Sequence, residues 1–203
     1  MRYRTLALAA AVLAVTAAGC NRKPAAPAEK PIVEAQPVPA PAPAEPTLHV
    51  TEGFRHQAGL DASGYYLSPT PFQVGDYRFA HMAIGAPSDF QTWEKGDHSS
   101  TFGPILIQFD DLTSPVVPNE LGGEGRAVQV RVLPEAYTFD AGRLTFRGKD
   151  ARLGEVLFVG TFDQAALAQA RSDGSSQATV LSGDLKIGAQ PVRKVTFTYW
   201  VGD

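Results

Sequence analysis

The stretch TVLSGDLKIGAQPVRKVTFTYW, Thr179–Trp200, decides the fold class of this 203-residue chain. Apolar and polar residues alternate within it on both sides of Gly188-Ala189, a pair typical of a turn. Successive side chains of a strand point to opposite faces, so one apolar face comes from Val195, Phe197, Tyr199 and Val201. We predict a β-hairpin formed by residues 179–187 and 192–201.

The same period of two recurs upstream, with glycine or proline between the runs. Tyr137-Thr138-Phe139 and Leu144-Thr145-Phe146 flank Asp140–Arg143, which indicates a second hairpin. Further strands are predicted in 104–109, 128–132, 155–162 and a run in which one face holds Tyr77, Phe79, His81 and Ala83. We expect a mainly β domain: one antiparallel β-sandwich or barrel of about 8–10 strands.

Two short helices interrupt this pattern. Ser88 has the spacing of a helix cap, with Gln91 at the third helical position and Gly96 as the stop. Asp163 is the predicted cap of a second helix, from Gln164 to about residue 171. Neither helix is long enough to organise the domain, so both are expected to cover an end or an edge of the sheet.

The N-terminus has the features of a secretory signal. Arg2 and Arg4 precede a 14-residue apolar run, and small residues lead directly to Cys20, the only cysteine. Ala17-Ala18-Gly19-Cys20 resembles the lipobox of bacterial lipoproteins, apart from Ala17, where that family usually has Leu. The resemblance implies cleavage after Gly19 and a covalent lipid on Cys20, and, because residue 21 is Asn rather than Asp, the periplasmic face of the outer membrane. An ordinary cleaved signal peptide with an incidental cysteine is the alternative.

Three segments follow from this reading. Residues 1–19 are the signal peptide, and residues 20–47 are a Pro/Ala-rich tether with eight prolines among residues 22–47. Proline removes backbone donors, and the tether has almost no large apolar residue to bury, so we expect it to be disordered. Residues 48–203 are the globular β domain.

Several functions are disfavoured by composition and motifs. A net charge of −3 without a Lys/Arg-rich run argues against nucleic-acid binding. A nucleophile elbow, a phosphate-binding loop and paired metal-ligand histidines are all missing from the sequence. We therefore predict that the domain is not an enzyme and that it has no cofactor other than the lipid.

One acidic cluster is a candidate metal site. Carboxylate oxygens are ligands that Ca²⁺ prefers, and they are supplied here by Asp110, Asp111, Glu120 and Glu124. The spacing is not that of an EF-hand, and a solvated acidic loop explains the same residues, so we predict no resident metal. Asp110 and Glu120 also suit a glycosidase carboxylate pair, which any β domain can offer by chance.

The aromatic residues Tyr65, Tyr66 and Trp93 are the candidate binding residues. Adjacent residues of a strand face opposite ways, so one of the two tyrosines is expected to be exposed. The favoured function is an interaction module on a membrane tether, with a protein partner in the cell envelope. The alternative is a carrier of lipid or another apolar ligand, because Thr179–Trp200 faintly resembles the last hairpin of periplasmic polyisoprenoid-binding, lipocalin-like proteins.

Overall fold

A computed structural model describes residues 47–118, 123–140 and 142–202. The signal peptide, Cys20 and almost all of the predicted tether lie outside the described residues. The two helices are α1 (Pro87–Glu94) and α2 (Gln164–Asp173). The strands are β1 (Phe54–His56), β2 (Gly64–Leu67), β3 (Gln73–Val74), β4 (Tyr77–Ile84), β5 (Ile105–Asp111), β6 (Val116–Pro118), β7 (Glu124–Arg126), β8 (Gln129–Val132), β9 (Pro134–Asp140), β10 (Arg143–Asp150), β11 (Gly154–Phe162), β12 (Ser175–Ile187) and β13 (Arg193–Trp200).

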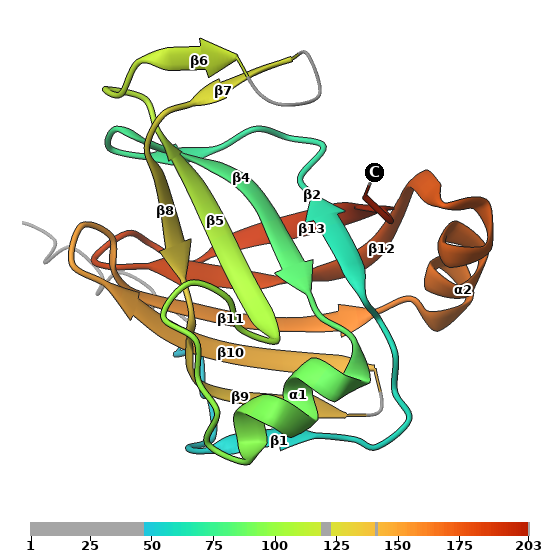
Figure 1. Cartoon of the computed structure of the whole chain (residues 1–203). Helices are drawn as coiled ribbons and strands as arrows, with labels where there is room; N and C mark the ends of the chain where they lie inside the picture. The colour runs from blue at the N-terminus through green and yellow to red at the C-terminus, as the bar shows by residue number, and fades with distance from the viewer. Residues whose placement is uncertain (1–46, 119–122, 141, 203) are drawn as a thin grey trace, which may run out of the picture. The chain divides into compact units, whose positions relative to one another are not determined.

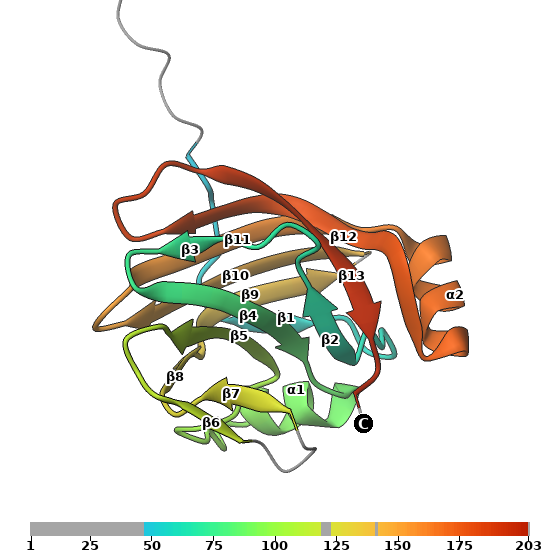
Figure 2. The same cartoon turned by 90° about the horizontal axis from the view of Figure 1, so that it is seen from above.

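One large curled sheet forms the domain, which confirms the predicted mainly β class (Figures 1 and 2). Its strands run in the order β1-β9-β10-β11-β12-β13-β2-β4-β5-β8, with β3 added beside β4. Among the described residues, the only parallel pair is β1 with β9. The curled sheet is called the barrel below, and the short strands β6 and β7 form a separate hairpin that projects from it (Figure 1). The described residues form thirteen strands, more than the predicted eight to ten, because the count includes β1, β3, β6 and β7, which have three residues or fewer.

Both predicted hairpins form, and in each of them apolar residues of the two strands lie opposite each other. Phe139 is opposite Leu144 in β9–β10, and Leu181 is opposite Phe197 in β12–β13. The buried face of the last strand is Val195, Phe197 and Tyr199, as the alternation predicted. Val201 departs from it: the strand ends at Trp200, and Val201 is 56% exposed.

At one corner of the sheet, where β8 leads into β9, two backbone segments approach each other closely. β8 continues through Leu133 directly into β9, so the chain links the last strand in the order to the second. The register of β9–β10 shifts between Arg147 and Gly148 at this corner. A Cβ atom at Gly148 would lie 2.4 Å from the Leu133 carbonyl oxygen, which is backbone and cannot move aside. Only glycine fits this corner without displacing the chain.

Large side chains fill the middle of the barrel. The rings of Phe79, Phe109, Phe158 and Phe197 form a continuous set with centroids 5.6–5.8 Å apart. The largest side chains with less than 2% exposure include Tyr66, Met82, Phe139, Phe146 and Leu144. Such packing stabilises the fold through burial of apolar area, roughly 1.5–3 kcal/mol for each large side chain.

A β-bulge in β4 overturns one expectation. Phe79 is opposite Phe109, but the next pair is His81 with Gln108, so Ala80 is an extra residue. The bulge reverses the faces from that point: Phe79 and Met82 point inward and are buried, whereas His81 and Ala83 lie on the outer face. The prediction that Tyr77, Phe79, His81 and Ala83 share one face is therefore wrong.

The helices cover an end and an edge of the sheet (Figures 1 and 2). α1 begins at Pro87, two residues before the predicted start, and the Ala86 amide donates to Asp89 Oδ2 at 2.8 Å. Ser88 is thus not the cap, because proline is favourable in the first turn and Asp89 satisfies the free amide. Gly96, with φ of 92°, follows the helix end as predicted. Asp163 caps α2 by accepting from the Ala166 amide at 2.9 Å, which confirms the second prediction.

We predict that Gly148→Ala lowers the free energy of unfolding by about 2–3 kcal/mol, because the added methyl group forces backbone apart at the β8–β9 corner. Urea denaturation followed by circular dichroism measures the loss. Gly125→Ala is the control, since a Cβ atom there would meet nothing within 4 Å. Equal stability of both variants would contradict the close approach at Gly148.

Candidate functional site

A groove of about 610 Å³ lies on the outer face of the barrel, over β2, β4, β5 and β8 and beside α1. Its volume is in the range of small-molecule sites. Its lining includes Tyr65, His81, Leu106, Gln108 and Arg131 on the sheet and Phe102 on the loop after α1. The groove is therefore separate from the packed interior.

Two cross-strand rows form the floor of the groove. The first row is apolar: Tyr65 of β2 pairs with Ala83 of β4, which pairs with Leu106 of β5. The second row is polar, with His81 opposite Gln108 and Gln108 opposite Arg131 of β8. Leu106 is 6% exposed and Gln108 is 7% exposed, although both point to the outer face. The floor thus changes from apolar to polar along the strands.

The loop after α1 supplies the opposite wall. Ser99 Oγ accepts hydrogen bonds from the amides of Thr101 and Phe102 at 3.0 and 3.2 Å, which holds the loop in a tight turn. The Phe102 side chain is 61% exposed, and the Arg131 guanidinium lies 4.9 Å from its ring centroid. This cation–π contact connects the loop to β8 across the groove.

Charge differs between the two ends of the groove. Asp89 and Asp97 line it near α1, and Asp89 Oδ2 already accepts from the Ala86 amide. Arg131 lies at the β8 side, and its Nε donates to Gln108 Oε1 at 3.2 Å. Burial is the main cause that lowers the pKa of His81; Asp110 opposes this shift and Arg131 adds to it. The imidazole is therefore neutral at neutral pH and contributes hydrogen-bonding groups rather than charge.

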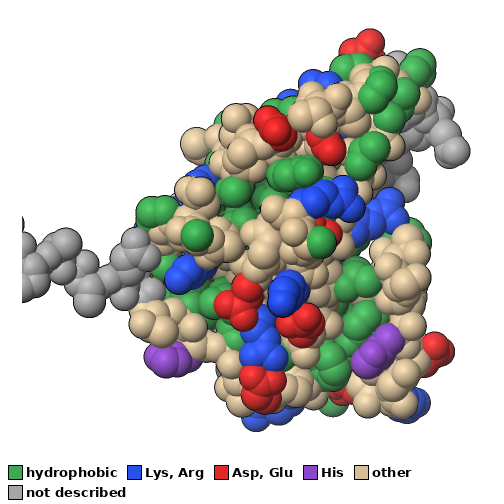
Figure 3. All heavy atoms as spheres, turned by 90° about the vertical axis from the view of Figure 1, so that its left-hand side faces the viewer, with side chains coloured by type: hydrophobic (Ala, Val, Ile, Leu, Met, Phe, Trp, Pro, Cys, Tyr) green, Lys and Arg blue, Asp and Glu red, His purple; other side chains and the backbone are tan. Residues whose placement is uncertain are grey.

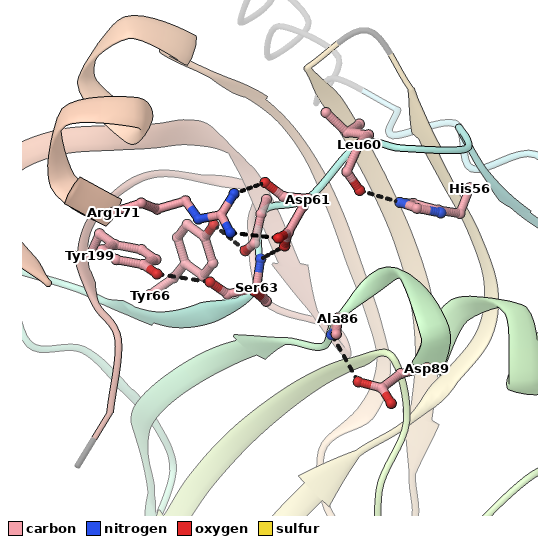
Figure 4. A network of polar contacts seen from close by, with 10 residues as sticks. His56, Leu60, Asp61, Ser63, Tyr66, Ala86, Asp89, Arg171 and Tyr199 are labelled. Atoms are coloured by element: carbon pink, nitrogen blue, oxygen red, sulfur yellow. Dashed lines mark hydrogen bonds and ion pairs between the residues drawn. The ribbon is translucent and has the colours of Figure 1, made fainter.

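A polar network holds the segment that leads into β2, the strand of Tyr65 (Figure 4). The Arg171 guanidinium of α2 donates to Asp61 Oδ2 at 2.5 Å, and Tyr199 Oη donates to the Ser63 carbonyl at 2.9 Å. Burial opposes ionisation of Asp61, but hydrogen bonds from Ser63 and Arg171 hold its pKa below the ordinary value. The network fixes residues 61–63 against α2 and β13, and β2 begins immediately after them.

The three aromatic candidates separate in the structure. Tyr65 lines the groove and contacts His81 and Trp200, with centroids 5.1 and 5.4 Å apart. Tyr66 lies in the core with 0% exposure, and its hydroxyl donates to the Ala62 carbonyl at 2.6 Å. Trp93 lines the groove but is only 5% exposed, stacked 4.2 Å from His98. Of the tyrosine pair, Tyr65 is thus the accessible one, because the strand sends Tyr66 inward.

The acidic candidates have other partners. Asp110 forms an ion pair with Arg78 at 2.9 Å. Asp111 Oδ1 accepts from the Thr113 hydroxyl at 2.6 Å and from its amide at 2.9 Å, and these hydrogen bonds lower the pKa of Asp111. Glu120 lies outside the described residues, and Glu124 begins β7 on the projecting hairpin. Within the described residues, no group of three or more metal-ligating side chains converges.

The groove residues Phe102, Leu106, Gln108 and Arg131 were missed by sequence reasoning. Leu106 and Gln108 belong to an apolar strand, and its sequence does not show which face is covered from outside. His81 was predicted to share a face with Phe79, because a bulge leaves no signal in the alternation of polarity. The cross-strand pairing that brings these side chains together becomes visible only in the register.

The face of the domain drawn in Figure 3 has mixed charge. Acidic and basic side chains alternate over its middle, which disfavours a partner recognised by one sign of charge alone. Hydrophobic side chains gather at the top, over the β6–β7 hairpin, where Val116 is 50% and Val117 is 37% exposed.

In the described part of the chain, no helix is long and apolar enough to cross a membrane. The chain matches no protein-family model, no curated protein and no solved structure. The fold and the outer groove are therefore the observations from which a function can be argued.

Proposed function

We propose that this protein is a membrane-anchored bacterial lipoprotein of the periplasm whose β domain is a non-catalytic binding module. In this proposal a lipid on Cys20 holds the chain at the periplasmic face of the outer membrane. The tether of residues 20–47 connects the anchor to the domain. The outer groove binds a component of the cell envelope.

The main support for the binding role is the set of side chains that the groove brings together. Its floor combines an apolar row with a polar row, and Tyr65 and Phe102 add aromatic surface on two different elements. Concave sites with apolar surface and a few placed polar groups are the usual form of ligand sites.

The packed interior supports this role over that of a carrier. A lipocalin-like carrier holds its ligand inside the barrel. Here the corresponding space contains the contacting rings of Phe79, Phe109, Phe158 and Phe197. Binding at the outer face needs no rearrangement of these side chains.

The anchor is tested by Cys20→Ser in the native host. We expect the wild-type chain to incorporate radiolabelled palmitate and to fractionate with outer membranes. The variant should incorporate none, because serine lacks the thiol that accepts the diacylglyceryl group. A variant that still incorporates label, or a wild type that never does, would contradict the anchor.

The groove is tested by photo-crosslinking in intact cells. Gln129 is exposed and lines the groove, so Gln129→p-benzoylphenylalanine should form a discrete adduct with the envelope component. Adding Ala83→Trp to this variant fills the floor and should remove the adduct. Mass spectrometry of the purified adduct identifies the component.

The matched control carries the same photoreactive residue at Thr196, which is exposed on β13 and does not line the groove. We expect no discrete adduct from position 196. Identical adducts from both positions, unaffected by Ala83→Trp, would place the contact elsewhere on the domain and contradict the role of the groove.

A further inference from the structure

We infer that the groove recognises a small amphipathic acid, with its carboxylate bound by the Arg131 guanidinium and its ring or apolar body packed between Tyr65 and Phe102. This inference depends on the proposed binding role of the groove and adds the chemical class of the ligand. It requires no covalent step, metal or cofactor.

Arg131 lines the groove and differs from Arg171 and Arg147, two other half-buried arginines, in having no carboxylate partner among the residues that the structure describes. Arg171 has a carboxylate of Asp61 at 2.5 Å, and Arg147 has one of Glu52 at 2.6 Å. Within the described residues, no carboxylate lies within ion-pair distance of Arg131, whose contacts are the Gln108 amide and the Phe102 ring. A guanidinium that loses water on two sides without a counter-charge is suited to an incoming anion.

The contacts of Arg131 leave its terminal nitrogens for a ligand. The hydrogen bond to Gln108 uses Nε, and the Phe102 ring centroid lies 4.9 Å from the guanidinium carbon. Arginine binds carboxylates with its planar fork of N–H groups, and the two contacts hold that fork in one orientation. Gln108 and the neutral His81 beside it add hydrogen-bonding groups without adding charge.

Asp89, one of the two aspartates that line the groove, lies near the end of β4 that is away from His81. A Cβ atom at Gly85 would lie 2.5 Å from Asp89 Oδ2, and Gly85 is four positions along the chain from His81, which is roughly 13 Å in an extended strand. An acid group at Arg131 is therefore away from the Asp89 carboxylate. The apolar row of Tyr65, Ala83 and Leu106 lies between the two ends and can accept the body of the ligand.

The test compares 2-naphthoate with 2-naphthamide, which have the same ring system and nearly the same shape but differ in charge. Equilibrium dialysis measures both dissociation constants on the full-length lipoprotein in nanodiscs, with binding to empty nanodiscs subtracted. We expect the acid to bind about tenfold more tightly than the amide, the effect of one charge-assisted hydrogen-bonded contact.

Arg131→Gln should reduce the ratio of the two constants to about one, because the neutral amide of glutamine lacks the charge. The matched control is Arg193→Gln. Arg193 is also half-buried and lies 5.0 Å from the Phe72 ring centroid, but it does not line the groove, so the ratio should stay unchanged.

Three results would overturn the inference. The acid and the amide could bind equally, the preference could persist in Arg131→Gln, or neither probe could bind. In each case an adduct from position 129 that Ala83→Trp removes would leave the binding role intact and show that the ligand class is wrong. The absence of both that adduct and any probe binding would overturn the binding role as well.

Discussion

The extra residue Ala80 in β4 is the feature on which the outer site depends. Without it, alternation would send His81 and Ala83 into the barrel with Phe79. With it, they join the outer face, where His81 pairs with Gln108 and Ala83 pairs with Leu106. One bulge thus gives the same strand an inward face that completes the core and an outward face that forms the floor of the groove. Bulges beside functional sites commonly redirect side chains in this way.

Core and groove are connected through the same elements. The start of β2 is held by the Arg171–Asp61 pair and by the Tyr199 hydroxyl, and the next residues along the strand are Tyr65 in the groove and Tyr66 in the core. The interior therefore acts as a rigid support, because interlocked aromatic side chains leave little freedom for the strands to shift. A site mounted on such strands keeps its geometry before the ligand arrives.

Sequence reasoning recovered the features that local chemistry determines. Strand alternation placed Phe197 and Tyr199 in the core, Gly142 and Gly188 lie in the predicted turns, and Asp163 caps α2 as its side chain suggested. It failed where the outcome depends on long-range pairing. The bulge at Ala80, the corner at Gly148 and the partners of Arg131 each involve segments that are far apart in the chain or whose register has no local signal. Of the predicted binding residues, Tyr65 and Trp93 line the groove, although Trp93 is only 5% exposed; strand alternation could show that one of the two tyrosines is accessible, but not which one.

The most direct test of this account is the access of a small solute to the two faces of the sheet. Methyl-resolved NMR of the protein with increasing TEMPOL, a small neutral spin label, measures the broadening of each methyl signal. The account predicts strong broadening for Ala83 in the groove and none for Leu144, Val156 and Leu185, which are at most 1% exposed in the interior. Broadening of the three interior signals with Ala83 unaffected would show an open barrel and a covered outer face, and would contradict the account.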